Sequence, residues 1–117
     1  MLAPIETQFA RLIWAHAPLA SGELVKLCET HLGWKKSTTY TVLRRLCDRG
    51  LFRNEGGTVT VVVSREEYEN RQSTSFVAEN YGGSLPRFLA AFSAGKKLSA
   101  EEVEALQALI DASRKDN

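Results

Sequence analysis

The chain has 117 residues, of which 44% are hydrophobic and 25% charged, and its formal net charge is +1. This balance is typical of a globular protein with one domain, or one domain and an appendage. The sequence has no apolar run of the roughly 18 residues that cross a bilayer and no signal-peptide pattern, so we expect a cytoplasmic protein without membrane insertion.

Three helices are predicted in the first half of the chain, over about 4–17, 21–32 and 36–49. Ser21 is expected to cap the second helix, and Gly33 to end it. Trp14 points away from the apolar stripe of the first helix and should meet a neighbouring element. The expected inward positions are Ile5, Phe9, Leu12, Ile13 and His16, then Leu24, Leu27, Cys28, His31 and Leu32, then Thr39, Val42, Leu43 and Leu46.

A two-stranded hairpin is predicted after the third helix. Residues 51–55 form the first strand, Gly56 and Gly57 supply the tight turn, and the β-branched residues 58–63 form the return strand. Three helices followed by a hairpin is the order of a winged helix-turn-helix. The predicted fold class is therefore mainly α with a small β-hairpin, with a winged helix-turn-helix DNA-binding domain over residues 1–64.

Residues 65–117 are predicted to form a helical dimerisation region. A polar helix over 65–81 is followed by a break, a helix that Ser84 caps, and a last helix opened by Ser99 and Glu102 as a capping box. So short a segment is marginal for a core of its own, so we expect a second copy of the chain to cover its apolar side chains. The expected dimerisation residues are Phe76, Tyr81, Leu85, Phe88, Leu89, Phe92, Val103, Leu106, Leu109 and Ile110.

The charge is distributed unevenly along the chain. Residues 1–63 carry a net charge of +3 and residues 64–117 a net charge of −2. The stretch 35–53 holds six lysines and arginines against one acidic residue, Asp48. This concentration of positive charge is typical of a surface that meets a phosphate backbone.

The third helix has the pattern of a DNA recognition helix. The exposed side of its first turns carries hydroxyl groups, which allow close approach to base edges, and arginines follow them. Two lysines before the helix and an arginine at the foot of the hairpin suit phosphate contacts. The predicted DNA-binding residues are Lys35, Lys36, Ser37, Thr38, Tyr40, Thr41, Arg44, Arg45 and Arg53.

Catalysis and metal binding find no support in the sequence. His16 and His31 lie on predicted core stripes, and Cys28 and Cys47 are separated too widely for a paired-ligand motif. No glycine-rich phosphate loop, nucleophile elbow or paired-histidine helix is present. We therefore expect a protein that is not an enzyme, with no cofactor, no metal and reduced thiols.

The chain resembles the penicillinase-repressor family, which includes the methicillin-resistance repressor and the copper-responsive repressor of the CopY type. The resemblance runs from about Ile5 to Ile110. It is carried by Glu6 with Leu12-Ile13-Trp14, by Trp34, Thr38, Thr41, Val42, Leu43, Arg45 and Leu46, by Gly50-Leu51, by Gly82-Gly83-Ser84-Leu85 with Phe92, and by Leu98-Ser99, Glu101-Glu102-Val103 and Leu106.

The resemblance implies a homodimer that binds double-stranded DNA at a palindromic operator and blocks transcription. It also implies release through a membrane sensor-protease pathway, with regulatory cleavage between Ala91 and Phe92. The β-lactam-responsive repressors carry asparagine where this chain has Ala91. The copper-sensing branch carries paired cysteines near its C-terminus, and this chain has none there.

Two other functions remain as alternatives to the repressor. A winged-helix protein–protein adapter without DNA binding would explain the near-neutral net charge and the predicted hairpin tip, residues 54–58, which lacks lysine and arginine. A small-ligand or metal sensor would need a pocket or ligand set that the sequence does not reveal.

Overall fold

The computed structural model describes residues 2–115, and the chain forms two compact units. The first unit is Met1–Ser73 and the second is Thr74–Asn117. The division lies inside one helix, α4 (Arg65–Tyr81), rather than at the change of composition after residue 64. Each unit is described by itself.

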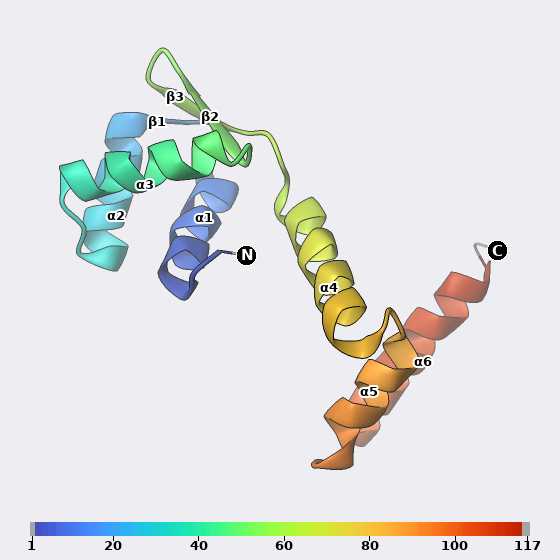
Figure 1. The fold of residues 1–117 in the computed structure, drawn as a ribbon. Coiled ribbons are helices and arrows are strands. Elements are labelled where there is room, and N and C mark those ends of the chain that lie inside the picture. Colours follow the sequence, from blue (N-terminus) through green and yellow to red (C-terminus); the bar gives the residue numbers. More distant parts are fainter. Residues whose placement is uncertain (1, 116–117) are drawn as a thin grey trace. The chain divides into compact units, whose positions relative to one another are not determined.

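Three helices and a small sheet make up most of the first unit (Figure 1). The helices are α1 (Pro4–His16), α2 (Ser21–Leu32) and α3 (Lys36–Asp48), as the apolar stripes predict. Gly33 ends α2 in the left-handed conformation with φ 68°, where a residue without a Cβ is favoured. Its N–H donates to the Glu29 carbonyl.

The sheet has three antiparallel strands in the order β1-β3-β2. The predicted hairpin is present as β2 (Phe52–Glu55) and β3 (Thr58–Val61). Gly56 and Gly57, with φ of 58° and 81°, form the turn between them. The third strand, β1 (Leu19–Ala20), pairs with β3 and was not anticipated from the sequence, because two residues are too few to show a strand pattern.

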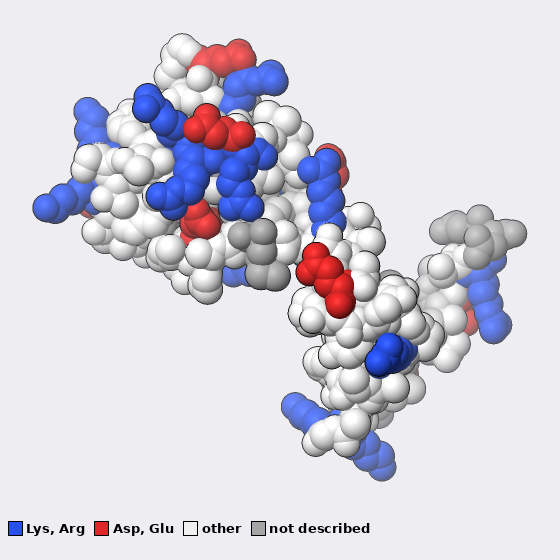
Figure 2. Space-filling view, in the orientation of Figure 1, with Lys and Arg blue, Asp and Glu red and all other residues white. Residues whose placement is uncertain are grey.

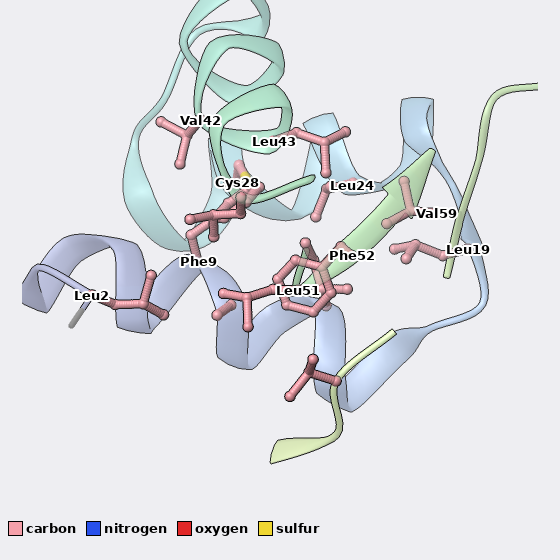
Figure 3. Close-up of a cluster of buried hydrophobic side chains, with 14 residues drawn as sticks. Leu2, Phe9, Leu19, Leu24, Cys28, Val42, Leu43, Leu51, Phe52 and Val59 are labelled. Atoms are coloured by element: carbon pink, nitrogen blue, oxygen red, sulfur yellow. The ribbon is translucent and has the colours of Figure 1, made fainter. Parts of the chain in front are cut away.

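The core of the first unit lies between the three helices and the inner face of the sheet (Figure 3). Trp14 joins the elements at its edge, as predicted: its indole nitrogen donates to the Val63 carbonyl over 3.0 Å, and its ring packs against Phe52 and Tyr68. The buried hydrophobic residues are Leu2, Phe9, Ala10, Ile13, Leu19, Leu24, Cys28, Val42, Leu43, Leu46, Leu51, Phe52, Val59 and Val63.

Four expectations for this unit are wrong. Ile5 is 45% exposed, and His16 and His31 are exposed as well. The buried stripe of α1 runs through Glu6, Phe9, Ala10 and Ile13, so Ile5 and His16 lie at its edge, and His31 lies in the last turn of α2, beyond the buried Leu24 and Cys28. Ser21 is the first residue of α2 and does not cap it, since the cap position is taken by Ala20. The Ser21 hydroxyl instead accepts a hydrogen bond from the Tyr40 hydroxyl over 3.1 Å.

The second unit contains the end of α4, together with α5 (Leu85–Ala94) and α6 (Ala100–Lys115). Both predicted caps are present. The Ser84 hydroxyl accepts from the Arg87 N–H, and Ser99 and Glu102 each bond the other's backbone N–H. No side chain of these helices is buried among the described residues. The unit therefore has no closed core of its own.

Candidate nucleic-acid interface

Helix α3 presents two chemically distinct faces. Its inward face buries Thr39, Val42, Leu43 and Leu46, as the helical period predicts. Its other side chains reach solvent, and those of the first two turns are mainly hydroxyls. Ser37, Thr38, Thr41 and Arg44 are all exposed. The buried face fixes the helix against the core, so the outward face is held at the surface of the unit.

The start of α3 carries two free positive charges. Lys35 occupies the cap position and Lys36 the first turn, and both are exposed. Within residues 2–115 neither lysine forms a salt bridge. Figure 2 shows lysine and arginine gathered on the face of the first unit where α3 lies in Figure 1. This face can attract a polyanion.

Arg45, one of the predicted DNA-contacting residues, forms an ion pair with a largely buried glutamate of α1. Its Nη1 lies 3.1 Å from Oε2 of Glu6, whose side chain is only 10% exposed. The other Glu6 oxygen accepts from the Ala3 N–H over 2.9 Å. The bond from Ala3, and then the one from Arg45, lower the pKa of Glu6 against the opposing effect of burial. Glu6 thus joins the beginning of α1 to α3.

Glu6 as the partner of Arg45 could not be found from the sequence. The two residues lie 39 positions apart, and their pairing depends on how α1 packs against α3. An acidic residue three positions after a helix cap indicates a capping box, but the pattern is recognised in a sequence only when the cap residue is serine or threonine. Here the cap is Ala3, which has no side-chain acceptor.

Three more predicted residues have partners within the first unit. Arg53 pairs with Glu55 over 3.3 Å, with both side chains well exposed. Tyr40 is half-buried and bonds Ser21, which ties α3 to the start of α2. The Thr41 hydroxyl donates to the Ser37 carbonyl over 2.9 Å and retains its capacity to accept.

A cleft of about 570 Å³ lies between α3 and the first strand of the hairpin. It brings Thr41 and Arg44 together with Asn54 of β2, a residue that the sequence analysis did not select. Only the packing of β2 beside α3 makes Asn54 a neighbour of this helix, so no local pattern could have identified it. The lining residues are Tyr40, Thr41, Leu43, Arg44, Cys47 and Asn54.

The histidines and cysteines are not assembled into a metal or redox site in the described part of the chain. Across residues 2–115 no group of three or more His, Cys, Asp or Glu side chains is placed to hold a metal ion. Cys28 and Cys47 are both free thiols. Burial raises the pKa of each, and the charge of Asp48 adds to the effect at Cys47.

The second unit exposes an unusual amount of apolar surface on α5 and α6. The exposed fractions are 64% for Leu85, 61% for Phe92, 50% for Val103, 68% for Leu109 and 49% for Ile110. Phe76, Tyr81 and Phe88 form a cluster with ring centroids 5.2–6.0 Å apart. Leu89 and Leu106 are half-buried. Side chains of this kind are normally covered by another protein surface.

Comparison with known proteins places these features in a family. The sequence model described as "Penicillinase repressor" matches residues 2–112 of this chain. The penicillinase repressor of Bacillus licheniformis is 26% identical over 114 residues, which cover 94% of this chain and 89% of that protein. No helix among the described residues is both long and apolar enough to span a membrane.

Proposed function

Since the chain belongs to the penicillinase repressor family, a family of transcriptional repressors, we propose that it acts as a homodimer on a palindromic DNA operator. The proposed reading element is α3, with its exposed hydroxyls in the major groove. One observation carries the proposal. The buried face of α3 fixes its outward face at the surface of the unit. On that outward side Lys35, Lys36 and Arg44 form no salt bridge with a carboxylate within residues 2–115. We expect the protein to bind DNA in the cytoplasm.

The lysine pair provides a sharp test of DNA binding. The double variant Lys35→Ala/Lys36→Ala should bind DNA from upstream of its own gene more weakly, measured by fluorescence anisotropy at several salt concentrations. Each lost phosphate contact should reduce the salt slope by about 0.9. Lys96→Ala/Lys97→Ala is the matched control, because it removes an exposed lysine pair between α5 and α6. Its affinity should stay at the wild-type value.

The same variants, measured by DNA binding and by retention on heparin, separate the repressor from the adapter. The adapter hypothesis rests on the near-neutral net charge and on the hairpin tip, which has no lysine or arginine, and the pairing of Arg53 with Glu55 is compatible with it. A wild-type chain that binds no duplex in low salt and elutes early from heparin would favour the adapter. Retention on heparin that Lys35→Ala/Lys36→Ala abolishes would favour the repressor.

The proposed dimer is formed by the apolar surface of α5 and α6. Each subunit would cover the exposed leucines, phenylalanine, valine and isoleucine of the other, and the burial of apolar area would drive association. Ile110→Asp should shift the mass measured by light scattering from dimer to monomer. Ile5→Asp is the matched control, because Ile5 is 45% exposed and Ile110 49% exposed, but Ile5 lies in the first unit. The Ile5→Asp variant should remain dimeric.

A proteolytic release step would act on this same surface. The Ala91–Phe92 bond lies within α5, and both residues are exposed. Cleavage there would separate α6 from the rest of the chain and so remove half of the proposed dimer surface. We propose that cutting this bond, through a membrane sensor-protease pathway, weakens operator binding. A chain that remains intact while its target genes are induced would contradict this step.

A further inference from the structure

The walls of the cleft between α3 and β2 are held in place by backbone hydrogen bonds. The Leu51 N–H donates to the Leu46 carbonyl over 3.1 Å, which fixes the start of the hairpin against the end of α3. The Gly50 N–H donates to the Cys47 carbonyl over 2.9 Å, which holds the turn that leads from α3 into β2. The cleft therefore does not depend on a ligand to form.

The charge of the cleft is positive and unshared. Arg44 is exposed, and within residues 2–115 it forms neither a salt bridge nor a side-chain hydrogen bond. Among residues 2–115 no carboxylate lines the cleft. The nearest acids in sequence are Asp48, which does not line it, and Glu55, which is paired with Arg53. The Asn54 amide adds a neutral donor on the opposite wall, so the cleft suits an oxyanion.

On the basis of the proposed function, we propose that this cleft holds one phosphodiester of the operator backbone. Arg44 supplies the charge and the Asn54 side chain donates a hydrogen bond from the hairpin. A recognition helix that lies in the major groove has the sugar–phosphate backbone beside it, and here the hairpin β2–β3 lies next to the helix on one side. At about 570 Å³ the cleft also has room for the flanking sugars. Arg44 is then a phosphate contact rather than a base reader.

The test combines protein variants with neutral backbone substitutions in the DNA. Operator duplexes that each carry one methylphosphonate are titrated with wild type and with Arg44→Gln. The wild type should lose roughly tenfold in affinity at one position in each half-site, as expected for a lost charged hydrogen bond. Arg44→Gln removes the contact in both half-sites, so it should bind unmodified DNA roughly a hundredfold more weakly and should no longer respond to the substitution at that position. Asn54→Ala should reduce the response without changing the salt slope.

Controls separate failure of this assignment from failure of the proposed function. Arg71→Gln removes an exposed arginine of α4 and should behave as wild type. If Arg44→Gln keeps the full methylphosphonate response, or changes the preferred base pair, the phosphate assignment is overturned, while binding through Lys35 and Lys36 still stands. If none of the variants changes binding, the proposed function fails as well.

Inorganic phosphate is the competing source of the same chemistry. Its effect is measured by the NMR shift of the Asn54 side-chain amide, at ionic strength matched with chloride. We expect no saturation at millimolar phosphate, because Arg44 is the only charged side chain of the described residues that lines the cleft. Saturable binding without DNA would assign the cleft to a free anion and overturn the operator contact.

Discussion

Glu6→Gln should destabilise the first unit while leaving its shape almost unchanged. Glutamine keeps the length of the side chain and can still accept from the Ala3 N–H, but it loses the charge that attracts Arg45. A hydrogen bond to a charged group contributes about 1.5–3 kcal/mol. Because the Arg45 side chain is 55% exposed, solvent screens its part of the interaction. We therefore expect a loss of about 1–2 kcal/mol in the free energy of unfolding.

Urea denaturation at pH 7 measures this loss, and a double-mutant cycle assigns it. Arg45→Gln should cost less in the Glu6→Gln background than in the wild type, because the partner is already neutral. Glu29→Gln is the control: it neutralises an exposed glutamate of α2 that forms no salt bridge in the described residues. Additive losses in the cycle, or equal losses for Glu29→Gln and Glu6→Gln, would refute the reasoning.

The pH dependence has a definite sign. The pKa of Glu6 is lower in the folded chain than its ordinary value of 4.5, so the folded state favours the carboxylate. Its contribution is fully present above about pH 4.5 and is lost as the pH falls through the lowered folded-state value. The stability difference between wild type and Glu6→Gln should therefore be constant from pH 7 to pH 5 and shrink below that. A difference that grows on acidification would contradict the assignment.

Three further outcomes test the first unit. Trp14→Phe should cost about 1–2 kcal/mol in urea denaturation, because it leaves the partly buried Val63 carbonyl without its donor. Gly57→Ala should destabilise by about 1 kcal/mol since φ there is +81°, whereas Gly22→Ala, in helix α2 with open space around it, should be neutral or stabilising. In mass-spectrometric alkylation of the native protein, Cys47 should react slowly and the fully buried Cys28 only on unfolding; equal rates would count against the core as described.

Much of the fold was predictable because it is encoded by local patterns. The buried residues of α3 follow the helical period, and the Gly56–Gly57 turn follows from a conformation that glycine adopts most readily. Periodicity misled at the edge of the α1 stripe and at the end of the α2 stripe, because it does not fix which side chains a neighbouring element covers. Ile5 is exposed beside the buried Glu6, and His31 is exposed in the last turn of α2. β1 is set by pairing with β3 and has no pattern of its own.

The candidate site was predictable as a list of residues but not as a set of contacts. Spacing along α3 places Thr41 and Arg44 on its outward face. Spacing cannot show that Glu6 holds Arg45 or that Asn54 faces the same cleft as Arg44, because these neighbours come from other elements. Long-range pairing therefore decides which basic residues remain available to a ligand.

This pairing predicts the salt dependence of operator binding. The stretch 35–53 has six basic residues, which in a dimer would give a slope of about −11 if every one neutralised a phosphate. Arg45 is paired with the buried carboxylate of Glu6 and is therefore not available to neutralise a phosphate. The exposed pair of Arg53 with Glu55 is weak enough for DNA to replace. Four or five free charges per subunit remain, so the slope should lie between about −7 and −9. Glu6→Gln, which releases Arg45, should make it steeper. An unchanged slope would mean that Arg45 reaches no phosphate even when it is free.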